Sequence, residues 1–143
     1  MKIKQRLCIV LAIICQIGAL LLEIIPNGVV LGLAKPDGNP DLYTYNYSSG
    51  MPATYAFTAP ILTGIATILL ILLCVIWLVR LNGKMIGKVT AGVSLLSVLF
   101  SAGVVLLTEY SRNAVTIGVV ALMAVAFALI VAACCIQKKG STL

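Results

Sequence analysis

The sequence predicts an all-α membrane protein, a bundle of four transmembrane helices with a small extracytoplasmic β-hairpin between the first two helices. Of the 143 residues, 62% are hydrophobic and only 10% are charged, whereas soluble domains average about 25% charged residues. Four apolar runs approach the roughly 20 residues that a helix needs to cross a bilayer. The one long polar stretch, residues 26–57, lies between the first two runs. We therefore predict a single membrane domain over residues 1–143.

The expected helices cover about residues 7–25, 58–80, 88–109 and 114–137. A basic segment before the apolar run 7–25 is also typical of a signal peptide. This run has 19 residues, however, and the apolar core of a signal peptide has about 7 to 15. We therefore expect it to be retained as the first helix.

The net charge of +6 follows the expected topology. Eight of the ten basic residues fall on one side of the membrane: Lys2, Lys4, Arg6, Arg80, Lys84, Lys88, Lys138 and Lys139. By the positive-inside rule, both termini are cytoplasmic and residues 26–57 lie outside a plasma (inner) membrane that the chain crosses several times. The expected partner of the basic residues is anionic lipid of the inner leaflet, and not nucleic acid.

Two polar side chains interrupt the first apolar run. Gln16 and Glu23 are seven residues apart, on the same helix face as Ala12 and Ala19, and we expect this face to turn inward. Glu23 has two interpretations, a structural or interfacial group whose carboxylate can reach water, or a functional ionisable site. With Glu109 and Arg112 near the same membrane depth, these residues form a candidate polar site for a cation; a solvated salt bridge between Glu109 and Arg112 is the alternative.

The outer loop predicts a β-hairpin that lies on the outer leaflet. Residues 29–34 and 41–47 are rich in β-formers, and Pro36-Asp37-Gly38 between them is turn chemistry. Strand alternation places three tyrosines on one face, either as headgroup anchors or as a recognition surface. The residues of this candidate interaction surface are Tyr43, Tyr45, Tyr47, Asp37 and Asp41.

Small hydroxylated residues recur along one face of the third helix. They form a predicted helix-packing seam: Thr90, Ser94, Ser97, Ser101 and Thr108. Small residues let helices approach closely, although such a seam can alternatively line a polar pathway. Trp77 is expected in an interfacial aromatic belt, and the glycines of Gly83-Lys-Met-Ile-Gly87 are a weak sign of helix dimerisation.

No catalytic constellation is visible, so we expect no enzyme. The chain has no histidine, which argues against a zinc site or a histidine relay, and we expect no cofactor. The five cysteines all lie in or at the cytoplasmic ends of predicted helices, so no extracellular disulfide framework is expected. Cys134 and Cys135 are interpreted as packing residues, with palmitoylation or a redox pair as the alternative.

Two resemblances add to this interpretation. Four helices, cytoplasmic termini and a long first outer loop with β-structure make the topology similar to that of the claudin and tetraspan-like group. The first loop of that group has tryptophan and two cysteines, whereas residues 26–55 have neither, so its paracellular function does not transfer. Segments 25–28, 36–38 and 55–64 resemble small uncharacterised bacterial four-helix membrane proteins, which implies a bacterial inner-membrane location and no activity.

The sequence favours a non-enzymatic membrane interaction or scaffold protein that presents its hairpin to a protein, a second copy of itself or lipid. The alternative is a small transporter or channel that uses Glu23 and Gln16 for a cation or a cationic substrate. Small multidrug transporters also have four helices. Their essential glutamate lies deep in the first helix and their loops are short, and this chain departs from them on both points.

Overall fold

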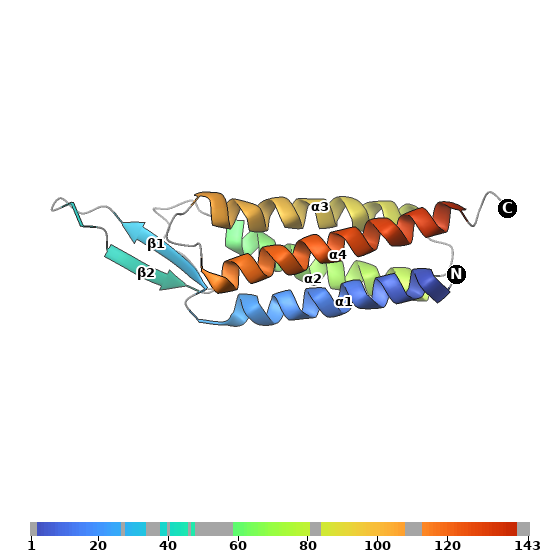
Figure 1. The fold of residues 1–143 in the computed structure, drawn as a ribbon, viewed down its shortest axis with the longest axis horizontal. Coiled ribbons are helices and arrows are strands. Elements are labelled where there is room, and N and C mark those ends of the chain that lie inside the picture. The colour runs from blue at the N-terminus through green and yellow to red at the C-terminus, as the bar shows by residue number, and fades with distance from the viewer. Residues whose placement is uncertain are drawn as a thin grey trace.

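In the computed structural model, four long helices run side by side and a two-stranded hairpin follows the first (Figure 1). The structure describes residues 3–26, 28–33, 38–39, 41–45, 47, 59–80, 84–107 and 113–139. Their elements are α1 (Ile3–Ile24), β1 (Val29–Leu33), β2 (Asp41–Tyr45), α2 (Ala59–Val79), α3 (Lys84–Leu107) and α4 (Ala114–Lys139). All four helices are long and apolar enough to cross a membrane. The prediction of a multi-pass membrane protein with a small hairpin is therefore confirmed.

Two helix starts differ from the prediction. The first and third helices begin at Ile3 and Lys84, whereas we expected residues 7 and 88. The apolar pattern ends where basic residues begin, but lysine and arginine are good helix formers, and their long side chains can extend to the membrane interface. The helices therefore continue beyond the apolar segments by about one turn.

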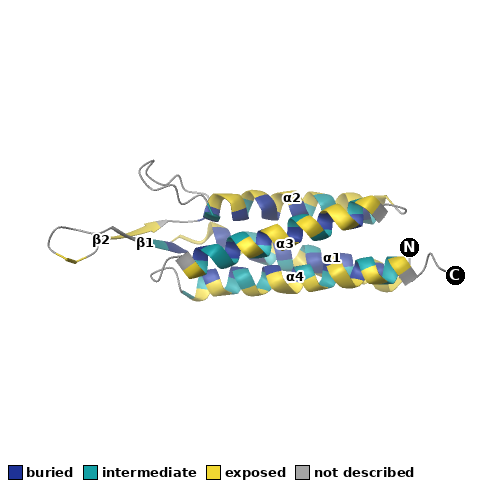
Figure 2. Ribbon diagram, turned by 90° about the horizontal axis from the view of Figure 1, so that it is seen from above, coloured by how far each residue is buried: buried dark blue, intermediate teal, exposed yellow. Residues whose placement is uncertain are grey.

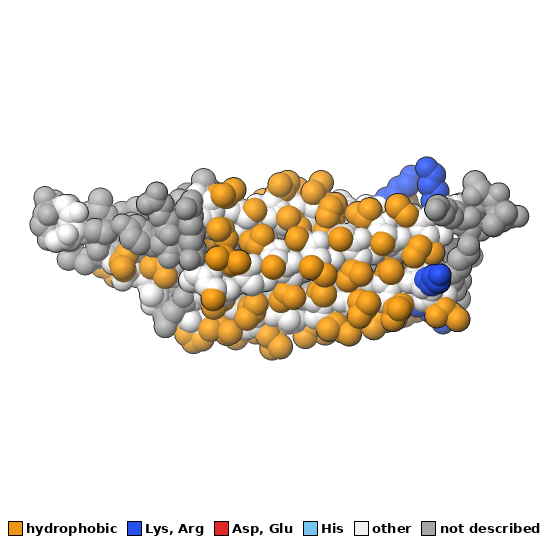
Figure 3. Space-filling view, viewed as in Figure 1, with side chains coloured by type: hydrophobic (Ala, Val, Ile, Leu, Met, Phe, Trp, Pro, Cys, Tyr) orange, Lys and Arg blue, Asp and Glu red, His pale blue; other side chains and the backbone are white. Residues whose placement is uncertain are grey.

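The helices form a four-sided bundle in which α1 and α3 each pack against both α2 and α4. The start of α1 and the end of α4 lie at one end of the bundle, here called the terminal end; the hairpin leaves the opposite end, called the hairpin end (Figure 1). Buried residues line the facing sides of the helices (Figure 2). Apolar side chains cover the outside of the bundle, and the basic side chains in view gather at its terminal end (Figure 3).

Many of the polar side chains point inward. The buried polar residues are Gln5, Gln16, Glu23, Thr63, Thr67, Thr90, Ser94, Ser97, Ser101 and Thr116. On α3, the hydroxyls of Thr90 and Ser97 donate to the carbonyl oxygens of Ile86 and Val93, at 2.7 and 3.1 Å. These bonds satisfy the hydroxyl hydrogens of Thr90 and Ser97 within α3, and the helix-packing seam stays a prediction. Thr108 of the predicted seam lies outside the described residues.

At the terminal end, α3 passes close to a buried tryptophan of α2. Trp77 is fully buried, and a Cβ built on Gly87 would lie 2.7 Å from its Cζ2 atom. The thiol of Cys134 on α4 donates to the Gly87 carbonyl at 3.4 Å. The belt position expected for Trp77 is wrong, because its ring fills the space left by Gly87 and does not face lipid. Gly87 serves packing within one chain.

The hairpin is antiparallel, with Val29 opposite Tyr45 and Leu33 opposite Asp41. Gly38 has a φ of +83°, the left-handed conformation expected of glycine in the turn. The two strands project beyond the hairpin end of the bundle (Figure 1). The expectation that the hairpin lies on the outer leaflet stays a prediction. The base of the ribbon is buried at Gly28 and Val29, and the position of this base directs the ribbon away from the bundle.

Candidate functional site

The most unusual group in the interior is a carboxylate at the hairpin end. Glu23 lies on α1 and is only 2% exposed. It borders a cavity of about 210 Å³ between α1 and α2. The cavity is lined by Leu20, Glu23, Ile24, Tyr47, Ile61, Gly64, Ile65 and Ile68. Most of its lining side chains are aliphatic. Glu23 places an ionisable carboxylate beside them, from the apolar helix α1.

Helical periodicity places Glu23 inward. The buried residues of α1 recur every three or four positions: Gln5, Ile9, Ala12, Gln16, Ala19 and Glu23. This is the spacing of one continuous helix face. The expectation that the face with Gln16 and Glu23 turns inward therefore agrees with the burial of both residues. The interfacial interpretation of Glu23, in which its carboxylate reaches water, is wrong.

One carboxylate oxygen is bonded and the other is not. Thr67 on α2 donates from its hydroxyl to Glu23 Oε1 at 2.8 Å. Glu23 Oε2 is buried and has no hydrogen-bond partner among the described residues. A Cβ built on Gly64 would lie 3.6 Å from this oxygen, so the absence of a side chain there leaves room beside Oε2. A buried carboxylate is costly unless it is paired or protonated, and the room beside Oε2 lets a hydrogen-bond donor or a cation approach it.

Thr67 is able to serve either protonation state of Glu23. Its Oγ1 lies 2.8 Å from Glu23 Oε1 and 2.9 Å from the Thr63 carbonyl oxygen. A hydroxyl has one hydrogen to donate and two lone pairs to accept. With an ionised Glu23, Thr67 donates to the carboxylate. With a protonated Glu23, the carboxyl donates to Thr67, which then donates to Thr63.

Tyr47 closes the cavity from the hairpin side. Its backbone N–H donates to the Glu23 carbonyl at 3.2 Å. Its side chain is 1% exposed, and its hydroxyl oxygen has no partner among the described residues. Burial raises the pKa of the Tyr47 phenol, and the Glu23 carboxylate raises it further. The phenol therefore stays neutral and able to donate a hydrogen bond.

The predicted row of three tyrosines is not one exposed surface. Tyr43 is exposed on β2, whereas Tyr47 is buried at the bundle. The reason is that β2 ends at Tyr45, so the strand alternation that would place Tyr47 beside Tyr43 stops before residue 47. The side chains of Tyr45 and Asp41, and the whole of Asp37, lie outside the described residues.

Gln16 extends the polar interior toward the middle of the bundle. It lies seven residues, or about two helical turns, from Glu23. Neither atom of its side-chain amide has a hydrogen-bond partner among the described residues. Such buried polar groups usually bind water or a ligand. Glu109 and Arg112, the other members of the predicted polar site, lie outside the described residues.

The residues that complete the site were not found from the sequence. Thr67 and Gly64 lie on α2 within one turn of each other, and a threonine or glycine in an apolar helix carries no specific signal. Within the described part of the chain, no three histidine, cysteine, aspartate or glutamate side chains form a group able to hold a metal ion.

Asn113 is a second position that sequence reasoning missed. Its Oδ1 accepts from the Thr116 backbone N–H at 2.9 Å, which caps α4. Its Nδ2 donates to the Gly28 carbonyl at 2.9 Å, next to the start of β1. The signal available in the sequence was the Asn-x-x-Thr spacing before the last apolar run, which resembles a capping box. Asn113 ties the hairpin base to α4.

We expect Asn113→Ala to lower the free energy of unfolding by about 1 to 2 kcal/mol, because it removes a helix cap and a link to Gly28. Thermal unfolding in mild detergent measures the change. Asn113→Asp is the matched control, because it keeps the capping oxygen and loses the donor to Gly28. A stability of Asn113→Ala equal to that of the parent would contradict the assigned cap.

The chain was also compared with known proteins. No protein-family model, no curated protein and no solved structure matches it.

Proposed function

We propose that this protein binds an organic cation, a primary ammonium group on an apolar body, at Glu23 in the membrane. This is the class of site that a small transporter or channel needs. The observation that carries the proposal is a buried carboxylate beside an apolar cavity, whose Oε2 has no partner in the part of the chain that the structure describes. It favours the cation-binding alternative over the interaction protein that the sequence favoured.

The site chemistry selects the ligand. A buried carboxylate is stabilised by an opposite charge, and an ammonium group is able to donate to both Glu23 Oε2 and the Tyr47 hydroxyl. The aliphatic walls suit an apolar body. A bare Ca²⁺ ion fits poorly, because calcium takes about 6 to 8 oxygen ligands, and the described lining offers only the carboxylate of Glu23 and the hydroxyl of Tyr47.

The two hydrogen-bond states of Thr67 support exchange of the cation for a proton. When the ammonium leaves, protonation of Glu23 removes the buried charge, and Thr67 accepts from the carboxyl while it donates to Thr63. Binding and release of the cation then leave no isolated charge in the bundle. Such an exchange is the elementary step of a proton-coupled transporter.

Binding is tested with the full chain in lipid nanodiscs by calorimetry. The probes are 2-phenylethylammonium and its uncharged analogue 2-phenylethanol, which share one apolar body. We expect the ammonium to bind at least about tenfold more tightly, which corresponds to about 1.4 kcal/mol. Equal affinities would show that the cavity takes apolar molecules without using the carboxylate, and would contradict the proposal.

The proposed orientation places the terminal end in the cytoplasm of a bacterial cell and the hairpin outside the plasma (inner) membrane. Its support is the position of the basic residues. Lys4 and Arg6 lie near the start of α1, Lys88 lies near the start of α3, and Lys138 lies near the end of α4, all at the terminal end. Cytoplasmic loops and ends of membrane proteins carry such an excess.

A second candidate function is self-association through the hairpin. Leu42 and Tyr43 are exposed on β2, at 56% and 45%, whereas Gly28 and Val29 at the base of the ribbon are buried. A lone two-stranded ribbon is marginally stable in water. A second copy of the chain that covers these side chains would stabilise the ribbon. Self-association through the hairpin is therefore proposed as a second function beside cation binding.

We expect the parent to be a dimer and Leu42→Ser with Tyr43→Ser to be a monomer, because the double variant removes the exposed apolar contact area. Mass photometry of the protein in nanodiscs measures this. Ile14→Ser with Ile17→Ser is the control, since both residues are exposed on α1 within the apolar span. An unchanged mass in the hairpin variant would exclude self-association through β2.

A further inference from the structure

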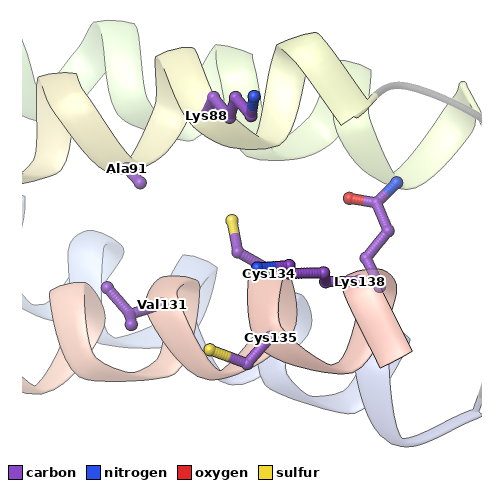
Figure 4. Close-up of a pocket in the computed structure, with 7 residues that line it drawn as sticks. Lys88, Ala91, Val131, Cys134, Cys135 and Lys138 are labelled. Atoms are coloured by element: carbon purple, nitrogen blue, oxygen red, sulfur yellow. The ribbon is translucent and has the colours of Figure 1, made fainter. Parts of the chain in front are cut away.

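A second cavity lies at the opposite end of the bundle from Glu23, between α3 and α4 (Figure 4). Its volume is about 560 Å³, within the range of about 300 to 1,000 Å³ typical of ligand sites. It is lined by Lys88, Ala91, Val131, Cys134, Cys135, Gln137 and Lys138. We propose that this groove binds one anionic phospholipid, with the headgroup phosphate at the lysines and an acyl chain along the apolar wall.

Charge complementarity selects the headgroup. Lys88 belongs to α3 and Lys138 to α4, so the two ammonium groups come from opposite walls of the groove (Figure 4). Gln137 adds a side-chain amide, and none of the described lining residues is acidic. Lysines are effective phosphate binders, and basic pockets between transmembrane helices are suited to anionic lipid headgroups.

The order of residues along the helices selects a lipid over a soluble phosphate. Lys88 and Lys138 lie at the terminal end, and Ala91 and Val131 lie three and seven residues farther into the bundle. In the close-up, the side chains of Ala91 and Val131 point toward each other across the groove (Figure 4). A phosphate at the rim therefore has an apolar channel beneath it, which matches a lipid with its headgroup at the interface.

Two cysteines of α4 line the groove between its lysine rim and its apolar part. Cys134 points into the groove, where its Sγ donates to the Gly87 carbonyl at 3.4 Å. Cys135 is exposed. Among the described residues, the groove and the Glu23 cavity share no lining residue, so the lipid site does not depend on the proposed cation binding.

The test is native mass spectrometry of the purified full chain, titrated with phosphatidylglycerol or phosphatidylcholine of the same acyl chains. We expect one tightly bound phosphatidylglycerol and no matching phosphatidylcholine adduct. Lys88→Gln with Lys138→Gln should weaken phosphatidylglycerol binding by at least about tenfold, because it removes the two lysines that line the groove and are placed to contact the phosphate. Lys4→Gln with Arg6→Gln removes two exposed charges from α1 at the same end and should change the affinity by less than about twofold.

Ala91→Leu provides the second arm, because it fills the apolar part of the groove and leaves both lysines in place. We expect it to weaken phosphatidylglycerol binding, with an unchanged far-UV circular dichroism spectrum as the check on folding. Three outcomes would overturn the proposal. They are equal losses in the two charge-reduced double variants, equal binding of phosphatidylcholine, and a covalent acyl mass on the purified chain that maps to Cys135.

Discussion

Glu23→Gln is expected to weaken binding of 2-phenylethylammonium by about 100-fold, close to 3 kcal/mol. Glutamine has the shape of glutamate and keeps an oxygen for the Thr67 hydroxyl, 2.8 Å from Oε1 in the parent. It lacks the charge that pairs with the ammonium. Calorimetry in nanodiscs measures the affinity, and flux of the same cation into vesicles should fall in parallel.

The control for this variant is Asp41→Asn, which removes the same charge from β2. We expect it to bind the ammonium as the parent does. Glu23→Gln should also fold at least as stably as the parent, because replacing a buried, half-satisfied charge by a neutral group is often stabilising. A stable Glu23→Gln protein that still binds the ammonium tightly would remove Glu23 from the site.

Gly87→Ala is expected to lower the free energy of unfolding by about 2 to 3 kcal/mol. The added Cβ would lie 2.7 Å from Cζ2 of the fully buried Trp77 ring. The indole is rigid and is packed in the core cluster of Ile9, Cys74 and Ile130. Relief therefore requires α3 to move away from α2. Thermal unfolding in mild detergent measures the loss.

Gly92→Ala is the matched control on the same helix. No atom lies within 4 Å of a Cβ built there, and alanine is a better helix former than glycine by about 1 kcal/mol. Its stability should equal or exceed that of the parent. Trp77→Phe should restore part of the stability lost in Gly87→Ala, because the smaller ring leaves room. Equal stabilities of Gly87→Ala and Gly92→Ala would contradict the close contact.

The helices and the hairpin were expected from local patterns in the sequence. Apolar length predicts four helices, and turn chemistry at Pro36-Asp37-Gly38 predicts the hairpin. The periodicity of α1 predicts that Gln16 and Glu23 turn inward. Each of these patterns lies within one element, because the surroundings of that element determine it. Lipid excludes charged residues from the outer surface of a transmembrane helix, and water favours polar residues in turns.

The partners across elements did not follow from such patterns. Thr67 meets Glu23 across 44 positions, Asn113 meets Gly28 across 85, and Trp77 meets Gly87 on the next helix. Tyr47 was misplaced because the strand alternation ends before it. These contacts depend on how neighbouring helices are rotated and spaced relative to one another. The hydropathy of a single helix does not indicate that relative placement.

By itself, the sequence determined that the chain crosses a membrane with four helices, carries a hairpin after the first helix, and turns the face of Glu23 away from lipid. These results follow from free energies of transfer, which are sums over the residues of one segment. Only the tertiary structure decided that Glu23 Oε2 borders a cavity with no partner from any described residue, and that Lys88 and Lys138 line a common groove. A cavity and an unpaired atom are properties of how the helices fit together, and they exist only once several segments occupy the same space.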